Sequence, residues 1–268
     1  AYELRCNLEA PVVAVRYLLG LPLAEPVPPV TLRLGTTRGT NALITRTGAR
    51  TALATTRGFG DVLEIGYQAR PRLFDLTVRK SPPLTAAVVE IAERLTHDGQ
   101  ILAEPSTAVV RQQLQSLLDS GIESLAIALL HADRHPAHER QIADIAREVG
   151  FAEISVSHEV APLPKIVARA DTTVVDAYLN PVLRDYVGRL AASLPGSHIR
   201  LLTSAGGLVA AGEFRGKDSI LSGPAGGVVG FSRVAQAAGF GRAIGFDMGG
   251  TSTDVARFDH RLGGHYEL

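Results

Sequence analysis

The stretch AIGFDMGGTSTDVARF, Ala243 to Phe258, carries the strongest indication of the fold. It joins two apolar runs through two acids, two glycines and three hydroxyl residues. Residues 243–246 and 255–258 have the length and composition of short strands, so the segment predicts a strand, a tight turn and a second strand. Gly249 and Gly250 suit the turn, because glycine adopts backbone angles closed to other residues and leaves no side chain in the way of a ligand.

The residues of this turn predict a phosphate site that includes a divalent cation. A glycine turn aims several backbone N–H groups into one small volume, which suits a phosphate, and Thr251 and Thr253 add hydroxyl donors. Asp247 and Asp254 alone would repel phosphate. They fit a site in which a cation lies between carboxylates and phosphates, usually through its own waters. An ordinary hairpin with a Gly-Gly turn is the alternative, and the full string DMGGTSTD favours the phosphate site.

The composition is that of a soluble globular protein with one large domain or two smaller ones in 268 residues. Acidic and basic residues balance at 27 each, so bulk charge predicts neither a nucleic-acid partner nor a membrane surface. No apolar run approaches the length of a membrane span. The single cysteine, Cys6, excludes an internal disulfide and fits a reducing cytosol. With no signal-peptide pattern at the N-terminus, we expect a cytoplasmic protein.

Strands and helices alternate along most of the chain, which predicts α/β layers. We expect strands at 31–37, 51–56, 86–95, 124–132, 151–157 and 198–204, and helices at 8–19, 37–48, 106–118, 135–150, 171–194 and 222–239. Ser106 is a plausible helix cap. The helix at 171–194 should break or bend at Pro181. Residues 57–76 have no clean period and are expected to form a long irregular segment, which in compact domains is often functional.

The predicted helix at 222–239 is unusually rich in glycine. Each of its inner glycines should weaken the helix by roughly 1 kcal/mol relative to alanine, which is tolerable where the helix approaches another backbone closely. These are Gly223, Gly226, Gly227 and Gly230. A small-residue helix followed by an acidic Gly-Gly-Thr turn resembles the actin, sugar-kinase and 70-kilodalton chaperone ATPases. In those proteins the helix crosses between two lobes and the next hairpin is the second phosphate loop. A glycine-rich helix packed for architectural reasons alone is the alternative.

A narrower resemblance rests on seven motifs in order: LGTTRGTNALI, TRGFGDVLEIGYQARPRLFDL, HPAHER, TTVVDAYLNPVL, LTSAGGL, SGPAGGVVG and GFDMGGTSTDV. Together they resemble the hydantoinase A/5-oxoprolinase family from about Thr31 to Val255. The resemblance implies an α/β fold of the actin-like ATPase (ribonuclease H-like) type. It also implies an N-terminal domain over residues 1–165 and the start of an ATPase-core domain over 166–268. Family members usually begin with a first D-x-G-G-T-x-T-D loop, and they continue after the second loop into the region that holds the adenosine. We therefore expect this chain to be incomplete at both ends and a poor ATPase alone.

The resemblance also implies an activity, the ATP-dependent opening of a cyclic amide such as a hydantoin or 5-oxoproline. ATP would phosphorylate the amide oxygen, and water would then attack the carbonyl carbon. In this scheme Asp247 and Asp254 are catalytic and bind Mg²⁺, and the ATP phosphates contact a set of small residues. That set is Gly249, Gly250, Thr251, Thr253, Gly226 and Gly227. A second subunit or domain of the hydantoinase B type, and a homo-oligomer, are the expected partners.

Two other functions stay open at this point. One is the ATP-using subunit of a ketone carboxylase of the acetone type, which shares these motifs. The other is a binding or regulatory module that kept the fold and lost turnover, for which the missing first phosphate loop is the argument. An upstream D-x-G-G-T-x-T-D in the full gene would weaken the second alternative.

Further candidates are weaker. Arginine suits bidentate contact with a substrate carboxylate, and helix N-termini attract anions. Substrate contacts are therefore considered for Arg38, Asn41, Arg70 and Arg72, against the alternatives of a capped helix and a surface loop. The cluster His131, His135, His138 and Glu139 raises the question of a metal, but a helix start with Glu139 near the positive end of the dipole is favoured. His158 and Glu159 follow a predicted strand and could face a cleft.

Overall fold

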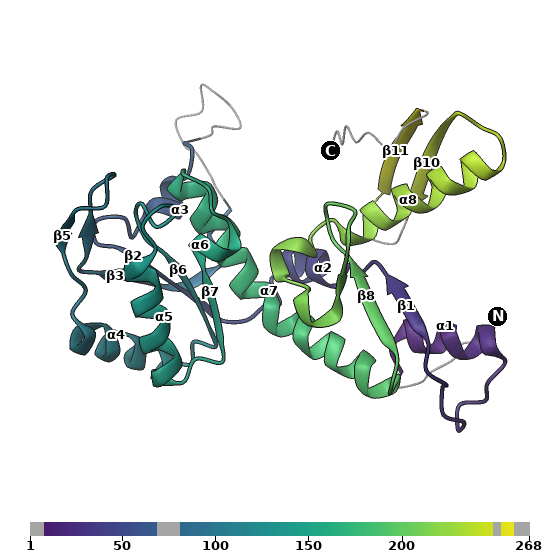
Figure 1. Cartoon of the computed structure of the whole chain (residues 1–268), viewed down its shortest axis with the longest axis horizontal. Helices are drawn as coiled ribbons and strands as arrows, with labels where there is room; N and C mark the ends of the chain where they lie inside the picture. The colour runs from purple at the N-terminus through teal and green to yellow at the C-terminus, as the bar shows by residue number, and fades with distance from the viewer. Residues whose placement is uncertain (1–7, 69–80, 249–252, 260–268) are drawn as a thin grey trace. The chain divides into compact units, whose positions relative to one another are not determined.

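The computed structural model describes residues 8–68, 81–248 and 253–259. Spatial contacts group the chain into two compact units, which we call the central unit, Ala42–Val182, and the terminal unit, formed by Ala1–Asn41 with Leu183–Leu268. Figure 1 labels the elements of both. The helices α2 (Arg38–Thr45) and α7 (Ile166–Ser193) each contribute residues to both units. The predicted domain boundary at residue 165 stays a prediction, because this grouping follows compactness alone.

The central unit is built on a parallel sheet of four strands in the order β3-β2-β6-β7. These strands are β3 (Thr85–Ile91), β2 (Thr51–Thr56), β6 (Ser124–Ala128) and β7 (Glu153–Val156). Every residue of β2 and β6 is buried, as expected for central parallel strands covered on both faces. One face packs against α4 (Thr107–Asp119) and α5 (Ala137–Val149), and the other packs against the first half of α7.

Short elements complete the central unit. They are the helices α3 (Val62–Ile65) and α6 (Ser157–Val160) and the antiparallel pair β4 (Arg94–Leu95) and β5 (Ile101–Ala103). The strand predicted at 86–95 is therefore two strands, separated where Glu93 turns its buried carboxylate toward Thr56 and His138. The strand predicted at 124–132 ends at Ala128, and Ser106 is the N-cap of α4 but makes no side-chain capping bond.

The helix α7 is continuous through Pro181, so a break at this proline is not found. A proline inside a helix lacks an N–H and displaces the carbonyl four residues earlier. Here that carbonyl, of Ala177, accepts a hydrogen bond from the Ser124 hydroxyl at 2.6 Å. The next carbonyl, of Tyr178, accepts one from the Ala49 N–H at 3.0 Å. Ser124 of β6 thus supplies the donor that Pro181 lacks, and Ala49, just before β2, adds a hydrogen bond to the next carbonyl.

The buried side of α7 also changes along its length. Ala170, Val174 and Ala177 pack in the core of the central unit, whereas Tyr186 and Leu190 pack in the core of the terminal unit. The change of side explains why a single amphipathic period over 171–194 describes this helix poorly. The helix α7 begins at Ile166, before the predicted start at residue 171.

The terminal unit contains a three-stranded sheet in the order β1-β8-β9. The strand β1 (Thr31–Leu34) runs parallel to β8 (His198–Leu202), and β9 (Leu208–Ala210) is antiparallel to β8. The helix α1 (Ala10–Leu19) and the second half of α7 bury Val12, Leu190 and Leu201 against this sheet. Two short 3₁₀ turns, η1 (Ala211–Glu213) and η2 (Gly216–Asp218), follow β9.

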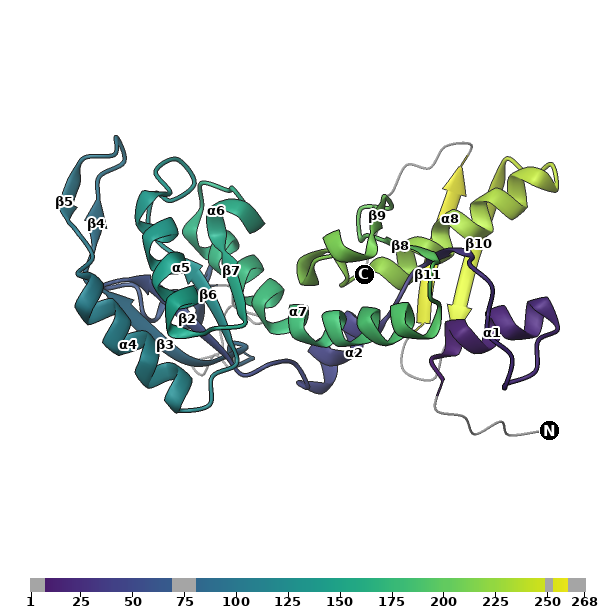
Figure 2. The ribbon, with the colours of Figure 1, turned by 60° about the horizontal axis from the view of Figure 1, so that its bottom comes forward.

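The last described elements are the helix α8 (Ser222–Ala237) and the antiparallel hairpin of β10 (Arg242–Met248) and β11 (Thr253–Asp259). Figure 2 shows α8 lying along the hairpin. Both predicted strands are confirmed. Gly245 allows the close packing, because a Cβ added there would lie 2.5 Å from the ring of Phe231 on α8.

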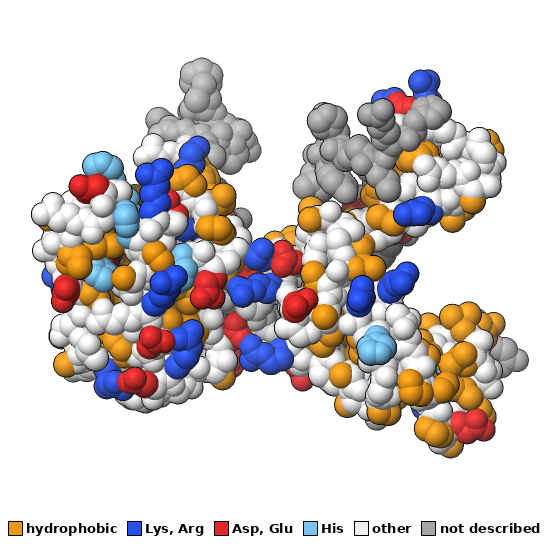
Figure 3. Space-filling model, viewed as in Figure 1, with side chains coloured by type: hydrophobic (Ala, Val, Ile, Leu, Met, Phe, Trp, Pro, Cys, Tyr) orange, Lys and Arg blue, Asp and Glu red, His pale blue; other side chains and the backbone are white. Residues whose placement is uncertain are grey.

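Two further observations concern the whole described chain. No helix in the described residues is long and apolar enough to cross a membrane. Basic and acidic side chains are interspersed on the face shown in Figure 3. Any affinity for an anion must therefore come from local groups rather than from a field of one sign over that face.

The role of Ser124 in α7 is testable by a double-mutant cycle. Ser124→Ala leaves the Ala177 carbonyl buried without a donor and should lower the free energy of unfolding by about 1–3 kcal/mol. Pro181→Ala restores the backbone N–H that this carbonyl accepts in an ordinary helix. The serine substitution should therefore cost much less in the Pro181→Ala background, as measured by urea unfolding. Equal costs in both backgrounds would contradict this account of α7.

Candidate phosphate and cation site

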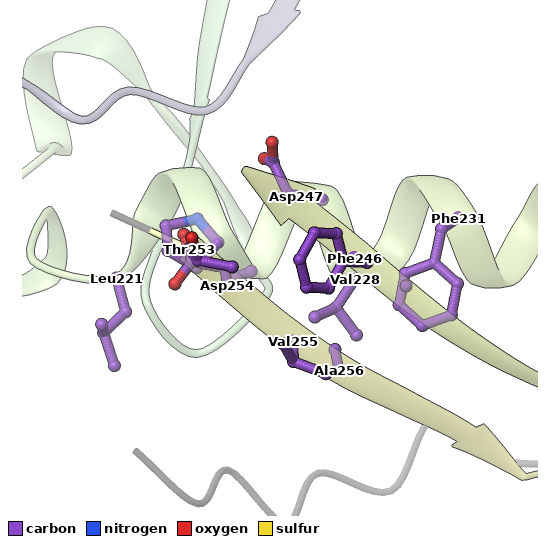
Figure 4. A pocket seen from close by; sticks show the side chains of 13 residues that line it. Leu221, Val228, Phe231, Phe246, Asp247, Thr253, Asp254, Val255 and Ala256 are labelled. Carbon is purple, nitrogen blue, oxygen red and sulfur yellow. The ribbon is translucent and has the colours of Figure 1, made fainter. Parts of the chain in front are cut away.

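A cavity of about 350 Å³ lies between α8 and the β10–β11 hairpin. The apolar walls include Val228 and Phe231 of α8 and Phe246 and Val255 of the hairpin (Figure 4). The other lining residues are Leu221, Pro224, Ala225, Gly227, Gly245, Asp247, Thr253, Asp254 and Ala256. The carboxylates and the threonine hydroxyl come from the ends of the strands that lead into the turn, so the cavity has an apolar wall and a polar end.

The two acids predicted from the sequence are neighbours across the two strands of the hairpin. Asp247 and Asp254 are direct partners in the antiparallel register, and such partners carry their side chains on the same face of the sheet. Like charges in this arrangement repel each other. Among the residues that the structure describes, neither carboxylate forms an ion pair with a basic side chain. The pair therefore fits a cation that would offset the repulsion.

The described residues also limit what kind of cation site this is. They contain no group of three or more His, Cys, Asp or Glu side chains that could hold a metal ion by themselves. Two carboxylates are enough for Mg²⁺, which usually keeps several waters and takes one or two protein carboxylates together with substrate phosphates. The donor set at Asp247 and Asp254 suits such an ion better than a closed structural metal site.

The structure brings together four of the residues predicted for this site. Asp247, Asp254, Thr253 and Gly227 all line the cavity. Gly226 lies on α8 but is not a lining residue, and a Cβ added there would lie 3.3 Å from the side chain of Leu202. Gly249, Gly250 and Thr251 lie outside the described residues.

The four glycines of α8 differ in their surroundings. Gly223 and Gly226 approach other parts of the unit, whereas a Cβ added at Gly227 or Gly230 would meet nothing within 4 Å. Close approach therefore explains only the first two. The apolar wall of the cavity was not predicted, although Pro224, Val228 and Phe231 follow the spacing of one helix face.

The residues considered for substrate contact are placed elsewhere or lie outside the described chain. Arg38 pairs with Glu9 at 2.8 Å and lies over the ring of Tyr186, with 5.1 Å between the guanidinium carbon and the ring centroid. Asn41 is in α2, and neither residue lines the cavity. Arg70 and Arg72 are not among the described residues. A substrate role for these four residues stays a prediction, and the observed contacts of Arg38 are with the protein itself.

His138 and Glu139 of the predicted histidine cluster are buried in the central unit. Glu139 is fully buried and accepts hydrogen bonds from the Leu129 N–H at 2.9 Å and from His158 Nδ1 at 2.7 Å. His138 Nδ1 donates to Glu93 at 2.7 Å. Both acids are thus paired with histidines inside the fold, which supports the structural interpretation of HPAHE over a metal site. His158 is held by Glu139 in the same way.

Comparison with solved structures defines the fold of the chain, and comparison of sequences defines its family. Over 91% of its length, the chain superposes with a TM-score of 0.78 and 24% identity on 37% of the chain in a nucleotide-free structure of acetone carboxylase. It superposes with a TM-score of 0.76 and 29% identity on an ATP-dependent caprolactamase from Pseudomonas jessenii, covering 92% of this chain and 38% of that one. The fold is of the actin-like ATPase type, as predicted.

The family follows from the sequence. Residues 5–150 match the hydantoinase/oxoprolinase N-terminal region, and residues 169–264 match the hydantoinase/oxoprolinase family. The chain therefore belongs to the hydantoinase/oxoprolinase family. It is 43% identical over 263 residues to a 5-oxoprolinase of Saccharomyces cerevisiae, covering 86% of this chain and 20% of the yeast protein. The chain spans about a fifth of that relative.

The contacts of Glu9 generate a prediction about acid stability. Partial burial acts to raise the pKa of Glu9, but hydrogen bonds and charges from Arg189 and Arg38 outweigh it, so the pKa lies below its ordinary value of 4.5. Because the pKa is lower in the folded state, this carboxylate stabilises the fold above about pH 4.5, and the contribution is lost as the pH falls through the folded pKa.

Glu9→Gln should therefore lower the free energy of unfolding by about 1 kcal/mol at neutral pH and flatten its fall below pH 4.5. Urea unfolding at a series of pH values measures both effects. Glu148→Gln is the matched control, because Glu148 pairs with Arg111 at a more exposed site and should change little. An acid-side slope equal to that of the unmodified protein would argue against the Glu9 assignment.

Proposed function

We propose that this chain supplies the phosphate-binding part of an enzyme that uses ATP to open a cyclic amide, such as a hydantoin or 5-oxoproline. Family membership supports this proposal, as do the names of two relatives, a 5-oxoprolinase and an ATP-dependent caprolactamase. The chemical reason for ATP is that an amide carbonyl is a poor electrophile. Phosphorylation of its oxygen makes the carbon open to attack by water.

The observation that carries the proposal is the pairing of Asp247 with Asp254 at the polar end of the cavity. These two carboxylates would hold Mg²⁺, directly or through its waters. When bound, the ion offsets the charge of the ATP phosphates and of the phosphoryl group in transfer. Thr253 and Gly227 line the same cavity, where Thr253 would donate its hydroxyl hydrogen to a phosphate oxygen and Gly227 would leave room for the nucleotide.

Other parts of the proposal rest on the sequence alone. Gly249, Gly250 and Thr251 would offer backbone and hydroxyl donors to phosphate, as the DMGGTSTD string predicts. A role for Gly226 at the nucleotide has less support, because its contact with Leu202 already accounts for a glycine there. The proposed partners are a cyclic amide substrate, a second subunit or domain of the hydantoinase B type, and further copies of the protein.

A ketone carboxylase is the second candidate. The likeness to acetone carboxylase has 24% identity, which establishes the shared fold and favours no particular activity. The higher identity to a 5-oxoprolinase is the reason to rank amide opening first. Assay of the full-length protein with 5-oxoproline, with a hydantoin, and with acetone plus bicarbonate, each with Mg·ATP, separates the two candidates by which substrate stimulates ATP hydrolysis.

The proposed site is tested by Asp247→Asn in the full-length protein. Removing one carboxylate charge should weaken Mg·ATP binding by about tenfold or more, equivalent to about 1.4 kcal/mol, and abolish substrate-stimulated ADP release. Isothermal titration with Mg·ATP measures the first effect. Asp259→Asn is the control, because Asp259 lies on the same hairpin but pairs with Arg242 and Arg257 outside the cavity.

Two outcomes would count against the proposal. One is equal Mg·ATP affinity in the Asp247→Asn and Asp259→Asn variants. The other is undiminished ATP binding after Mg²⁺ is removed with a chelator, because the two carboxylates would then repel the phosphates without compensation.

A further inference from the structure

Two segments that are far apart in the sequence interlock at the start of α8. One is residues 35–40, the turn between β1 and α2 together with the first residues of α2, and the other is the segment 220–223. We propose that Ser222 is a positioning residue for the phosphate site, acting through the first turn of α8 without touching the nucleotide. This inference rests on the function proposed above and adds a specific means by which the β1–α2 turn controls that site.

The side chain of Ser222 joins three elements. Its hydroxyl donates to the Leu202 carbonyl at the end of β8, at 2.6 Å, and accepts the Thr36 N–H at 3.1 Å. The residue is fully buried. The hydroxyl hydrogen is donated to β8, and the hydroxyl oxygen accepts the N–H from the β1–α2 turn. No other residue type of this size makes both bonds with the same geometry.

Two glycines bring the same segments into direct contact. A Cβ added at Gly35 would lie 2.9 Å from the Ser222 carbonyl oxygen, and one added at Gly223 would lie 2.7 Å from Cγ2 of Thr37. Such separations are too short for a real side chain, so each glycine marks a close approach. The Thr40 hydroxyl adds a hydrogen bond to the Ile220 carbonyl.

The start of α8 depends on these outside contacts. Its N-cap, Leu221, offers no side-chain capping bond, and the helix carries glycines that weaken it. Leu221 and Pro224 flank the interlocked residues and line the cavity. A shift of the first turn would therefore move the part of the cavity wall formed by Leu221 and Pro224 relative to Asp247 and Asp254, whose position relative to each other is set by the register of the hairpin.

A comparison of two serines on the same helix tests the proposal in the full-length protein. Ser222→Ala removes the bridge between the segments. Ser232→Ala removes a hydroxyl that is equally buried but bonds only within α8, to the Val229 carbonyl at 3.0 Å. We expect Ser222→Ala to weaken Mg·ATP binding at least fivefold in isothermal titration and to raise KM for ATP more than it lowers kcat. Ser232→Ala should bind like the unmodified protein.

Stability is measured alongside, because both substitutions are expected to lower the free energy of unfolding. A purely structural role predicts that the two variants differ in stability alone. Equal Mg·ATP affinities for Ser222→Ala and Ser232→Ala, in a protein that binds Mg·ATP, would overturn the positioning role and leave the proposed function standing. Failure of the unmodified protein to bind Mg·ATP would overturn both.

A double-mutant cycle tests the contact between Gly223 and Thr37 independently of Ser222. Gly223→Ala should weaken Mg·ATP binding, because the new methyl group meets the Thr37 methyl group at 2.7 Å. Thr37→Ser removes that methyl group and leaves the next atoms at 3.7 and 3.8 Å, so the double variant should recover most of the affinity. Gly230→Ala is the control, since a Cβ there meets nothing within 4 Å. Lack of recovery in the double variant would contradict the proposed interlock.

Discussion

The terminal unit depends on the close contact between the first turn of α8 and the turn after β1. The unit is assembled from the two ends of the described chain, and β1 and β8 form its only parallel strand pair among the described residues. Parallel pairing of distant strands closes a long loop, which costs conformational entropy before the contacts are made. Ser222 and Gly223 add hydrogen bonds and close packing at the end of that pair, next to the start of α8.

The same principle applies in the central unit, where a local irregularity is accommodated by a distant donor. Pro181 deprives α7 of a hydrogen bond, and Ser124 on β6 supplies one to the carbonyl that the proline leaves unpaired. A buried unpaired carbonyl would cost about 1–3 kcal/mol, enough to favour a break in the helix. The sheet therefore determines that α7 stays continuous, and a continuous α7 can contribute to the cores of both units.

These examples show where prediction from sequence succeeds and where it stops. Local signals such as a hydrophobic period, a helix cap or a turn residue can be read from the sequence. They predict the hairpin strands, the glycine-rich helix and most helices of the central unit. The continuity of α7 could not be predicted, because its cause is a serine 57 positions before the proline in the chain (from 124 to 181). The reason for Gly223 lies likewise in Thr37, which no local pattern connects to α8.

For the candidate site, the sequence identified the carboxylates but not the wall that faces them. Acids and hydroxyls beside a glycine turn have few structural explanations, so they stand out in a sequence, whereas Val228 and Phe231 resemble any buried helix face. Asp247 is exposed and Asp254 is half-buried, so the apolar wall excludes water from one side of the carboxylate pair only. The cavity keeps its shape through three contacts: the register that pairs β10 with β11, the packing of Gly245 against Phe231 of α8, and the Ser222 bridge at the start of α8.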